Sequence, residues 1–398
     1  MKNKLIISAV FSPEPVVSAK LSEDIAVELA LTNTVTVLAP KPTRPFGFTN
    51  QNSQKLNSGF VLINLDSYTC PESNLFGRFR ESYSFGIACR KFISKNNKDI
   101  DLIYMNSWPI FSQYIIAKTA EKYNISLITH VQDIYPESLS NKLPKLKAIL
   151  NFVFLSMDKY VLNNSSKIIA ISKEMKGYLA KTRGLNKDKI EVVLNWQNEE
   201  SFLEYKRING KSKKSNSFVF MFLGNIGPVA GVDSIIKAFI KAKIEGSKLI
   251  IAGSGSKKIE LQKFVKVSKV TNIEFLDVPD GKVPEFQSLS DVMLLPIKKG
   301  AASSSIPSKL PAYMFSKKPI LASVDSDSET SRVILEAKCG WVVEPEDIDV
   351  LKDKLIEVFN LNTKELHEKG VSGYNYAMNF LSKRHSLSKI INLINQPQ

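Results

Sequence analysis

The chain has 398 residues, 43% of them hydrophobic and 23% charged. This length suits two α/β domains better than a single core, and the composition argues against a disordered chain. The three cysteines, Cys70, Cys89 and Cys339, show no paired spacing, which favours a reducing compartment over a disulfide framework or a zinc site. The formal net charge of +15 predicts an anionic partner: nucleic acid, an acidic membrane surface or a phosphorylated substrate.

The N-terminal apolar run is short and ends at the segment Ser-Pro-Glu-Pro, residues 12–15. It therefore indicates a buried first strand rather than a signal peptide. No apolar stretch along the chain reaches the length that a membrane-spanning helix needs. Together with the cysteine pattern, this predicts a cytoplasmic protein.

In the first half of the chain, short β-branched runs alternate with helix-length segments. This alternation is typical of βαβ units and a parallel sheet. The expected strands are Leu5–Val10, Val35–Leu38, Phe60–Ile63, Leu102–Met105, Ser126–Thr129, Lys167–Ala170 and Ile190–Leu194. The expected helices are Val16–Leu31, Leu75–Lys95, Ile110–Lys122, Lys145–Leu162 and Ser172–Lys181.

The same alternation restarts after a polar stretch, Asn209–Ser217, which is the expected linker between two domains. The expected strands are Phe218–Leu223, Lys248–Ala252, Asn272–Phe275, Val292–Leu295, Ile320–Ser323 and Trp341–Val343. The expected helices are Val232–Lys241, Lys257–Val267, Val283–Ser288, Ser308–Phe315 and Thr330–Glu336, with helices only beyond Ile348. In doubly wound sheets ligands bind outside the carboxyl ends of the strands, so we expect the chemistry in the loops that follow them.

Two glycine-rich loops follow the first two strands of the second half. Gly224, Gly227 and Gly231 lead into one helix, and Gly253 and Gly255 lead into the next. Glycines let backbone N–H groups approach a phosphate at a helix N-terminus. Tight turns that need a positive φ explain these glycines equally well, because their spacing differs from the dinucleotide-binding fingerprint.

Two further loops carry polar or small residues at strand ends. The loop KKGAASSSIPSKLPAYMF places Lys309 in a first helical turn, where a lysine is unfavourable against the helix dipole unless an anion compensates it. A diphosphate would compensate it, and a lysine that points to solvent is the alternative. The loop FLDVPDGKVPEF offers exposed backbone around Val278 that could pair with a flat base.

Acidic residues follow the strand PILASV. Asp325 and Asp327 could suggest a metal site, but acids near a helix N-terminus are ordinary caps, and we expect no metal. Glu329 is better placed to accept hydrogen bonds from ribose hydroxyls, which is the role of an acid beyond a nucleotide-binding strand.

Candidate catalytic residues lie in two loops of the first half. FSPEPVVSAK places Glu14 at the start of the first helix, and THVQDIYPES brings His130, Asp133 and Glu137 close together in sequence. A histidine beside an aspartate suits general acid–base chemistry. A lone histidine at a strand end is more often a packed or surface residue.

These loops, in this order, resemble family 4 of the retaining glycosyltransferases, which has the GT-B fold. THVQDIYPES is similar to the family's VQDLWPES segment, VLNWQNEESF to its PNW strand end, and FLGNIGPVAG to its GNIG loop. FSPEPVVSAKLSEDIAVELA resembles its first loop and helix. IPSKLPAYMFSKKPILASVD resembles a subgroup of O-antigen and capsule transferases that includes N-acetyl-L-fucosamine transferases.

The chain departs from the family pattern in its phosphate and sugar loops. The usual pair of glutamates falls on Ser304 and Ala312, and Asn225 stands where an arginine is common. By analogy, Lys309 becomes the main cation for the donor diphosphate and Glu329 a candidate ligand of the ribose. The donor-binding set that the resemblance implies is Asn225, Gly227, Gly253, Val278, Ser303, Ser304, Lys309 and Glu329.

The resemblance implies two Rossmann-like domains facing a central cleft. An acceptor-binding domain is expected over 1–205, a domain that binds the nucleotide sugar over 206–375, and a C-terminal helix over 376–398 that returns to the first domain. The implied reaction moves a sugar, such as an N-acetylated deoxyhexosamine, from a UDP-linked donor with retention at the anomeric carbon. No metal and no cofactor are expected. The implied acceptor is a saccharide on a polyprenyl diphosphate, in O-antigen or capsule synthesis.

Such an acceptor would bring the chain to the inner face of the plasma membrane as a peripheral protein. The segment Leu75–Lys95 has aromatic residues at helical spacing beside arginines. Basic charge with apolar side chains suits an interfacial contact. The basic residues expected at the anionic surface are Arg78, Arg80, Arg90, Lys91, Lys142 and Lys145. A basic face that is simply solvated explains these residues equally well.

Two other functions remain open at this point. A nucleotide-sugar epimerase shares the two-domain fold but acts on a single nucleotide sugar. A non-catalytic binder of polysaccharide or nucleic acid would use the basic surface instead. Only 9% of residues are aromatic and no basic–aromatic single-strand motif is visible, so no nucleic-acid partner is expected.

Overall fold

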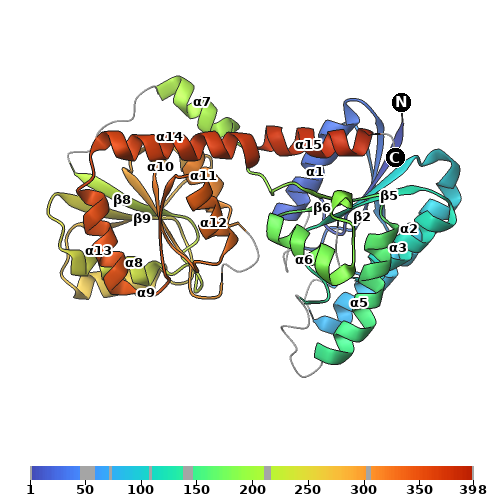
Figure 1. Cartoon of the computed structure of the whole chain (residues 1–398), viewed down its shortest axis with the longest axis horizontal. Helices are drawn as coiled ribbons and strands as arrows, with labels where there is room; N and C mark the ends of the chain where they lie inside the picture. The colour runs from blue at the N-terminus through green and yellow to red at the C-terminus, as the bar shows by residue number, and fades with distance from the viewer. Residues whose placement is uncertain are drawn as a thin grey trace. The chain divides into compact units, whose positions relative to one another are not determined.

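The computed structural model describes residues 2–44, 59–70, 74–106, 110–137, 147–209, 217–301 and 306–396. They divide into two compact units (Figure 1). The first unit comprises Met1–Leu194 and Ser386–Gln398, and the second comprises Asn195–His385. The first boundary, after Leu194, precedes the expected boundary at residue 205. The second boundary, after His385, follows the expected boundary at residue 375. The chain thus leaves the first unit once and returns to it.

Within the described residues, the first unit is built on a parallel sheet of seven strands in the order β3-β2-β1-β4-β5-β6-β7. The direction in which the strands are added reverses between β1 and β4, which makes this pair the topological switch point. The strands are β1 (Asn3–Ile7), β2 (Thr34–Pro40), β3 (Val61–Leu65), β4 (Leu102–Asn106), β5 (Ser126–Val131), β6 (Lys167–Ala170) and β7 (Ile190–Val192).

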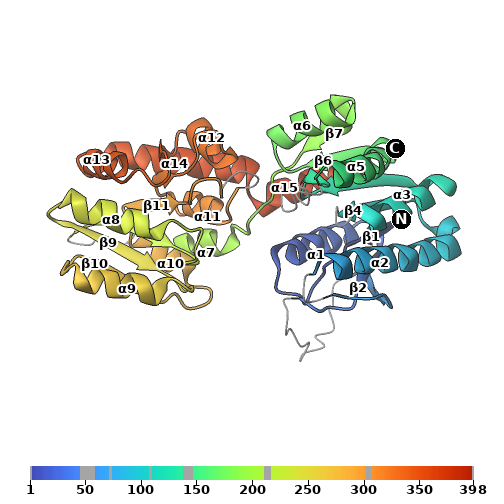
Figure 2. The same ribbon diagram turned by 90° about the horizontal axis from the view of Figure 1, so that it is seen from below.

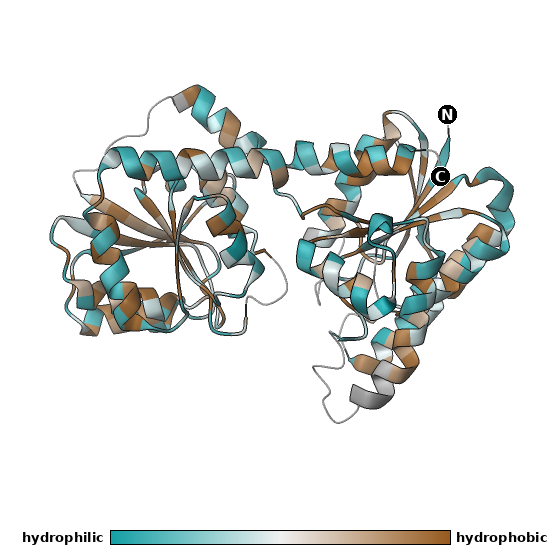
Figure 3. Ribbon diagram, viewed as in Figure 1, coloured by the Kyte–Doolittle hydropathy of each residue, from teal (hydrophilic) through white to brown (hydrophobic). Residues whose placement is uncertain are grey.

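Three helices of the first unit, α2 (Leu75–Asn96), α3 (Ile110–Lys122) and α5 (Lys147–Asn164), lie together on one face of this sheet (Figure 1). Phe85, Cys89 and Ile93 fall on one side of α2, at spacings of four residues, and pack with the strands in a buried core. Figure 3 shows the strands as mostly hydrophobic and the helices as mixed. This unit also contains α1 (Val17–Ala30) and α6 (Lys173–Arg183).

The described part of the second unit has a parallel sheet of six strands in the order β10-β9-β8-β11-β12-β13, with its switch point between β8 and β11. The strands are β8 (Phe218–Leu223), β9 (Ser247–Ala252), β10 (Ile273–Leu276), β11 (Val292–Pro296), β12 (Ile320–Ser323) and β13 (Gly340–Val343). Figure 2 shows helices on both sides of this sheet. The helices are α7 (Glu200–Asn209), α8 (Val232–Ala242), α9 (Lys258–Val267), α10 (Val283–Ser288), α11 (Lys309–Phe315), α12 (Glu329–Glu336), α13 (Ile348–Phe359) and α14 (Thr363–Phe380).

The sequence pattern of α8 explains why it covers this sheet. Val232, Ile235, Ile236 and Phe239 recur at helical spacing and are all buried in the core of the second unit. Gly231 directly precedes the first turn of the helix, and its φ of +63° lies in the left-handed region where glycine has no steric cost. This turn directs the loop that precedes it, residues 224–230, across the carboxyl end of β8.

The last helix, α15 (Lys383–Asn395), begins in the second unit and continues in the first. At its start, the Glu199 carboxylate accepts backbone N–H groups of Lys383 at 2.8 Å and Arg384 at 3.3 Å. At its end, the buried Lys4 ammonium donates to the carbonyl of Ile394 at 3.2 Å. A negative charge at the N-terminus and a positive charge at the C-terminus both interact favourably with the helix dipole. Each end of α15 is therefore stabilised electrostatically.

Candidate functional site

The carboxyl ends of β8 and β11 separate at the switch point of the second unit. Their ladder pairs only Val292 with Phe220 and Met293 with Met221. Beyond it, the Tyr313 hydroxyl donates to the carbonyl of Leu223 at 2.8 Å and accepts the Leu223 N–H at 3.1 Å. A side chain of α11 therefore satisfies the backbone groups that a neighbouring strand would otherwise pair, and it fixes α11 beside the end of β8.

Lys309 lies one helical turn before Tyr313 on α11 and is brought to the same strand end. Its ammonium nitrogen is 5.0 Å from the centre of the Phe222 ring, and burial lowers its pKa. Among the described residues, no carboxylate lies within salt-bridge distance of this ammonium. A desolvated cation without a counter-ion is costly, so this position favours an anionic ligand.

Gly224 is what makes room for this lysine. A Cβ built on Gly224 would lie 2.0 Å from Lys309 Cε, and its φ of +153° is one that other residues rarely adopt. Gly253 and Gly255 are required by the backbone of the first loop. A Cβ on Gly253 would lie 2.2 Å from the Gly224 carbonyl oxygen, and a Cβ on Gly255 would lie 2.4 Å from the Ile226 carbonyl oxygen. The two glycine loops thus pack backbone against backbone, which a phosphate-binding role alone does not require.

Hydrogen bonds between the two loops keep them together. The Ile226 N–H donates to the Ser254 carbonyl at 2.7 Å, and the Lys257 N–H donates to the Ile226 carbonyl at 3.0 Å. Asn225 is exposed, and Gly227 and Val278 are half-buried at the ends of β8 and β10. Ser303 and Ser304 lie outside the described residues.

The acids after β12 have partners within the protein. Glu329 is 7% exposed, and its carboxylate accepts from the Arg332 guanidinium, through Nε at 3.1 Å and through Nη2. Asp325 accepts the Gly300 N–H, at 2.9 Å to Oδ2, which ties the β12–α12 loop to the β11–α11 loop. A ribose that binds to Glu329 would therefore contact a carboxylate that is already paired with Arg332. Asp325 holds the two loops together.

A cavity of about 400 Å³ borders one of the predicted residues, Gly227. Its wall comes mainly from α8 and α9, with Val232, Leu261 and Phe264 as apolar lining, and Lys298 lies at its edge. Lys309 and Glu329 do not line it. The cavity is thus on the α8–α9 side of the glycine loop, whereas Lys309 approaches that loop from α11.

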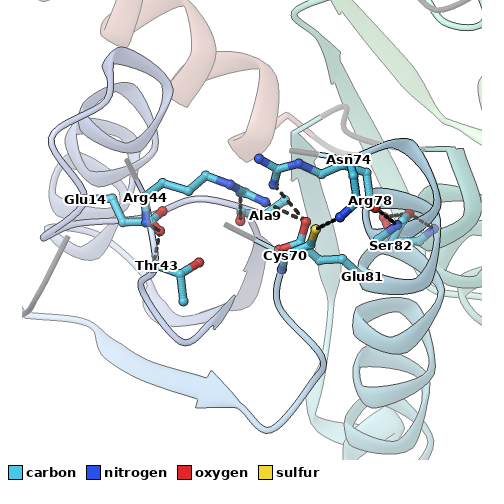
Figure 4. Close-up of polar contacts among 11 residues, drawn as sticks. Ala9, Glu14, Thr43, Arg44, Cys70, Asn74, Arg78, Glu81 and Ser82 are labelled. Atoms are coloured by element: carbon cyan, nitrogen blue, oxygen red, sulfur yellow. Dashed lines mark hydrogen bonds and ion pairs between the residues drawn. The ribbon is translucent and has the colours of Figure 1, made fainter. Parts of the chain in front are cut away.

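In the first unit, Glu14 is buried, and its carboxylate serves the backbone. Glu14 Oε1 accepts the N–H groups of Thr43 at 2.6 Å and Arg44 at 2.8 Å (Figure 4). The carboxylate thereby fixes the segment that follows β2. Because Oε1 receives both hydrogen bonds, Glu14 is a positioning group for this segment.

Beside Glu14, two arginines converge on one buried acid. Glu81 accepts from Arg44 at 2.7 Å, from Arg78 at 2.9 Å and from the Cys70 N–H at 3.1 Å (Figure 4). Glu81 is 2% exposed, so its ion pairs with the two arginines are desolvated. Their contribution to stability therefore depends on well-formed hydrogen bonds. Arg78, which the sequence assigns to a membrane surface, instead lies half-buried in this cluster. Arg80, Arg90 and Lys91 are exposed, and Lys142 and Lys145 lie outside the described residues.

His130 is fully buried, which the sequence pattern leaves open. Its Nδ1 lies 2.5 Å from the Tyr104 hydroxyl and its Nε2 lies 2.9 Å from the Gln132 amide nitrogen. Burial lowers the pKa of His130 to about 3, so the ring is neutral at physiological pH. Asp133 is exposed and is not a partner of either ring nitrogen; the structure does not bring the two together.

Glu137 and Arg183 lock the loop after β5. Arg183 Nη2 donates to Glu137 at 2.7 Å and Arg183 Nε donates to Asp158 at 2.7 Å, with the Arg183 side chain fully buried. Burial raises the pKa of Asp158 to about 6, against the charge of Arg183. Arg183, Arg44, Tyr104 and Gln132 are not predicted from the sequence. Tyr104 sits in the apolar strand LIYMN and Arg183 in the lysine-rich end of a helix, so neither differs from core or surface background.

No cluster of three histidine, cysteine, aspartate or glutamate side chains that could hold a metal ion occurs among the described residues. No described helix combines the length and hydrophobicity that a membrane crossing needs. Burial, polar groups and loop geometry coincide at Lys309 with the glycine loops in the second unit, and at the Glu14 and His130 clusters in the first.

Comparison with known proteins gives consistent matches. Residues 23–200 match the family described as Glycosyltransferase Family 4, and residues 204–372 match that described as Glycosyl transferases group 1. The probable glycosyltransferase WbjE of Pseudomonas aeruginosa is 24% identical over 59% of this chain and 60% of its own length. The putative colanic acid biosynthesis glycosyl transferase WcaI of Escherichia coli K12 is 24% identical over 37% of this chain and 38% of its own length. The chain thus spans less than two thirds of either relative.

A solved structure shares the fold over nearly the whole chain. Anabaena Alr3699/HepE, crystallised in complex with UDP, has a TM-score of 0.67 and 15% sequence identity, with 99% of each chain covered. Both sheets are parallel and doubly wound, and the family matches divide near the boundary between the two units. The chain belongs to family 4 of the glycosyltransferases and has their GT-B fold of two Rossmann-like domains.

Proposed function

We propose that this protein transfers a sugar from a UDP-linked donor to a saccharide acceptor, and that its second unit binds the donor. The observation that carries the proposal is Lys309, a partly buried ammonium without a carboxylate partner among the described residues, at the switch point where ligands of doubly wound sheets bind. The neighbouring glycine loops, Gly224–Gly227 and Gly253–Gly255, bring backbone N–H groups to the same edge of the sheet.

The chemistry that Lys309 would supply is stabilisation of the departing diphosphate. When the bond between the anomeric carbon and the diphosphate oxygen breaks, negative charge develops on that oxygen. A fixed ammonium and backbone N–H groups in a partly desolvated site stabilise this charge without a metal ion. Binding of the diphosphate would also raise the pKa of Lys309 again, because an opposite charge favours the protonated amine. We propose a retaining outcome, as the family resemblance implies.

The relatives support a role in the synthesis of a surface polysaccharide. HepE carries UDP in its crystal structure, and WcaI is described as a colanic acid biosynthesis enzyme. We therefore propose a lipid-linked saccharide as the acceptor, with an N-acetylated deoxyhexosamine as one candidate donor sugar. A nucleotide-sugar epimerase of the same fold is the alternative, and it differs because it would convert a UDP-sugar without any acceptor.

The first test is calorimetric titration of the purified protein with UDP, GDP and ADP. We expect selective UDP binding that weakens at least about ten-fold, or 1.4 kcal/mol, in Lys309→Ala. Lys299→Ala is the matched control, because Lys299 is an exposed lysine of the same β11–α11 loop. Equal losses in both variants, or no binding of any nucleotide by the folded protein, would refute the donor site.

We further propose that the first unit meets an anionic membrane surface as a peripheral protein. Phe79 of α2, Phe111 of α3 and Phe154 of α5 form an aromatic cluster with ring centres 5.5–5.6 Å apart. On two of these helices, Phe76 of α2 is 84% exposed and Phe152 of α5 is 82% exposed. Exposed aromatic side chains beside basic residues suit an interfacial contact, and Arg80 is exposed on the same turn of α2 as Phe76.

Vesicle sedimentation tests this contact. We expect binding to phosphatidylglycerol-containing vesicles that decreases with salt and falls strongly in a Phe76→Ser/Phe152→Ser variant. Val267→Ser is the control, because Val267 on α9 is 80% exposed but lies in the second unit. Wild-type protein that stays in the supernatant at low salt would refute the proposal.

A further inference from the structure

A continuous run of hydrogen bonds crosses the carboxyl edge of the first unit's sheet at its switch point. It begins at Gln132 and His130 after β5 and passes through Tyr104 to Asn106, at 3.5 Å between the Tyr104 hydroxyl and Asn106 Oδ1. The Asn106 amide then donates to Ser22 on α1, whose hydroxyl donates to the Ser18 carbonyl at 2.9 Å.

The amide orientation of Gln132 determines the order of donors and acceptors along this run. The Gln132 amide nitrogen can only donate, so His130 Nε2 accepts and the ring proton resides on Nδ1. Nδ1 then donates to the Tyr104 oxygen, and the Tyr104 hydroxyl donates onward to Asn106. Every donor then points the same way, from Gln132 towards α1.

Burial separates the members of this run into two kinds. Tyr104 and His130 are fully buried and have no open path to a substrate. Gln132 and Asn106 are half-buried and stand at the ends of β5 and β4, and β4 is one of the two strands of the switch point. The outer two residues can meet a ligand, and the inner two can act only through them.

We propose that Tyr104 and His130 are positioning residues that hold Gln132 and Asn106 as hydrogen-bonding groups for the hydroxyls of a bound saccharide. Side-chain amides both donate and accept, as sugar hydroxyls do, and an amide held in one orientation loses less entropy when it binds. This inference rests on the proposed transfer function and gives the first unit a specific part in it. In this proposal, His130 orients the two amides and is not the general acid or base that the sequence suggests.

Two amide variants of His130 separate orientation from general packing. Asparagine places its amide near the position of Nδ1, so His130→Asn keeps the link to Tyr104 and weakens the link to Gln132, whose amide nitrogen lies 3.4 Å from Nδ1 against 2.9 Å from Nε2. Glutamine reaches the position of Nε2, so His130→Gln keeps the link to Gln132. Both are neutral and similar in polarity, and a merely structural role would not favour the one that reaches Gln132.

The assay uses UDP-sugars and a short-chain prenyl diphosphate N-acetylglucosamine as the acceptor probe. We expect His130→Asn to lower kcat/KM for the acceptor at least about ten-fold, with most of the loss in KM, and His130→Gln to stay within a few-fold of the wild type. Gln132→Ala should match His130→Asn, and the double variant His130→Asn/Gln132→Ala should lose no more than either single one.

A second readout does not depend on turnover. Side-chain amide signals of Gln132 and Asn106 are followed by NMR during titration with the acceptor probe, and we expect both to shift in the wild type. UDP affinity, measured on the same samples, should be unchanged in all His130 variants. If UDP binds but neither amide responds, or if His130→Asn and His130→Gln behave alike, the inference is overturned and the proposed function survives. If UDP does not bind, the proposed function fails as well.

Discussion

The side chain of Lys309 occupies space that only a glycine at position 224 can leave open. The sequence presents Gly224 as part of a phosphate loop, and the structure gives it a second task, which is to admit the lysine stem beside the strand end. The lysine itself is predicted from the sequence because a cation in a first helical turn is unfavourable without an anion. The need for Gly224 is not, because it depends on the approach of α11 in space.

We therefore expect Gly224→Ala to weaken UDP binding by displacing Lys309. The added Cβ also forces a residue other than glycine into a positive φ, which costs about 1–3 kcal/mol of stability. Gly246→Ala separates the two effects, because Gly246 has a φ of +74° with open space around its Cβ position. Calorimetry should show weaker UDP binding in Gly224→Ala alone, with lower thermal stability in both variants.

His130 should make the first unit sensitive to acid. Its pKa is about 3 in the folded protein against 6.5 for the free side chain, so between these values only the unfolded state takes up a proton. The contribution of neutral His130 to the free energy of unfolding is complete above pH 6.5 and decreases as the pH falls towards 3. At pH 5 the free energy of unfolding is lower by about 2 kcal/mol.

Hydrogen exchange of β5 amides at pH 7.5 and 5 measures this loss. Protection factors are the observed exchange rates corrected for the intrinsic chemical rate at each pH. We expect them to fall at pH 5 in the wild type and to fall much less in His130→Gln. His367→Gln is the control, since His367 is exposed on α14. Identical pH dependence in wild type and His130→Gln would contradict the assigned burial effect.

At the level of elements, the alternation of apolar runs and helix-length segments predicts both parallel sheets. Ile110–Lys122 is predicted with the bounds that the structure shows, and α2 differs by one residue at its end. α7 is not predicted, because most of its residues are polar and its burial depends on Phe202, which packs on Phe315 of α11. Hydrogen bonds between elements, such as Tyr104 to His130, leave no periodic signal in the sequence.

Arg183 holds three elements together through its guanidinium, and its loss should destabilise the first unit. Arg183→Met leaves the buried Asp158 and the half-buried Glu137 without their counter-charge, and breaking a buried pair costs about 3–5 kcal/mol at neutral pH. This cost should shrink as the pH falls below 6, because the uncompensated carboxylates then take up protons.

Urea unfolding at pH 7.5 and 5.5 measures both effects. Lys237→Met is the control, because its ion pair with Asp233 is exposed and such pairs contribute at most about 1 kcal/mol. A loss in Arg183→Met that is no larger than in Lys237→Met would show that the buried cluster does not secure the loop after β5.

On the scale of the whole molecule, the chain enters the first unit twice. The final helix is held at one end by Glu199 and at the other by Lys4, with Ile390 and Ile394 buried between. The sequence predicts a returning helix only through the family resemblance. The contact of Lys4 with Ile394 joins residues 390 positions apart, and nothing local in either segment signals it.

We expect Lys4→Met to loosen the end of α15. The Ile394 carbonyl and its neighbours would lose their charged partner at the negative end of the helix dipole, a contribution of about 0.3–1 kcal/mol or more when partly buried. Hydrogen exchange of amides 386–395 should accelerate in Lys4→Met and stay unchanged in Lys2→Met, since Lys2 is exposed. Equal exchange in both variants would show that Lys4 does not hold the helix.

The double entry into the first unit also sets where this chain can be recombined. In topological terms the second unit is an insertion between Leu194 and Ser386 of the first. A chimera that exchanges everything after the linker would remove the helix that the first unit buries and leave Ile390 and Ile394 without their site. A transplant of residues 195–385 alone keeps both cores whole, so exchange of donor specificity between relatives should follow those two junctions rather than a single crossover.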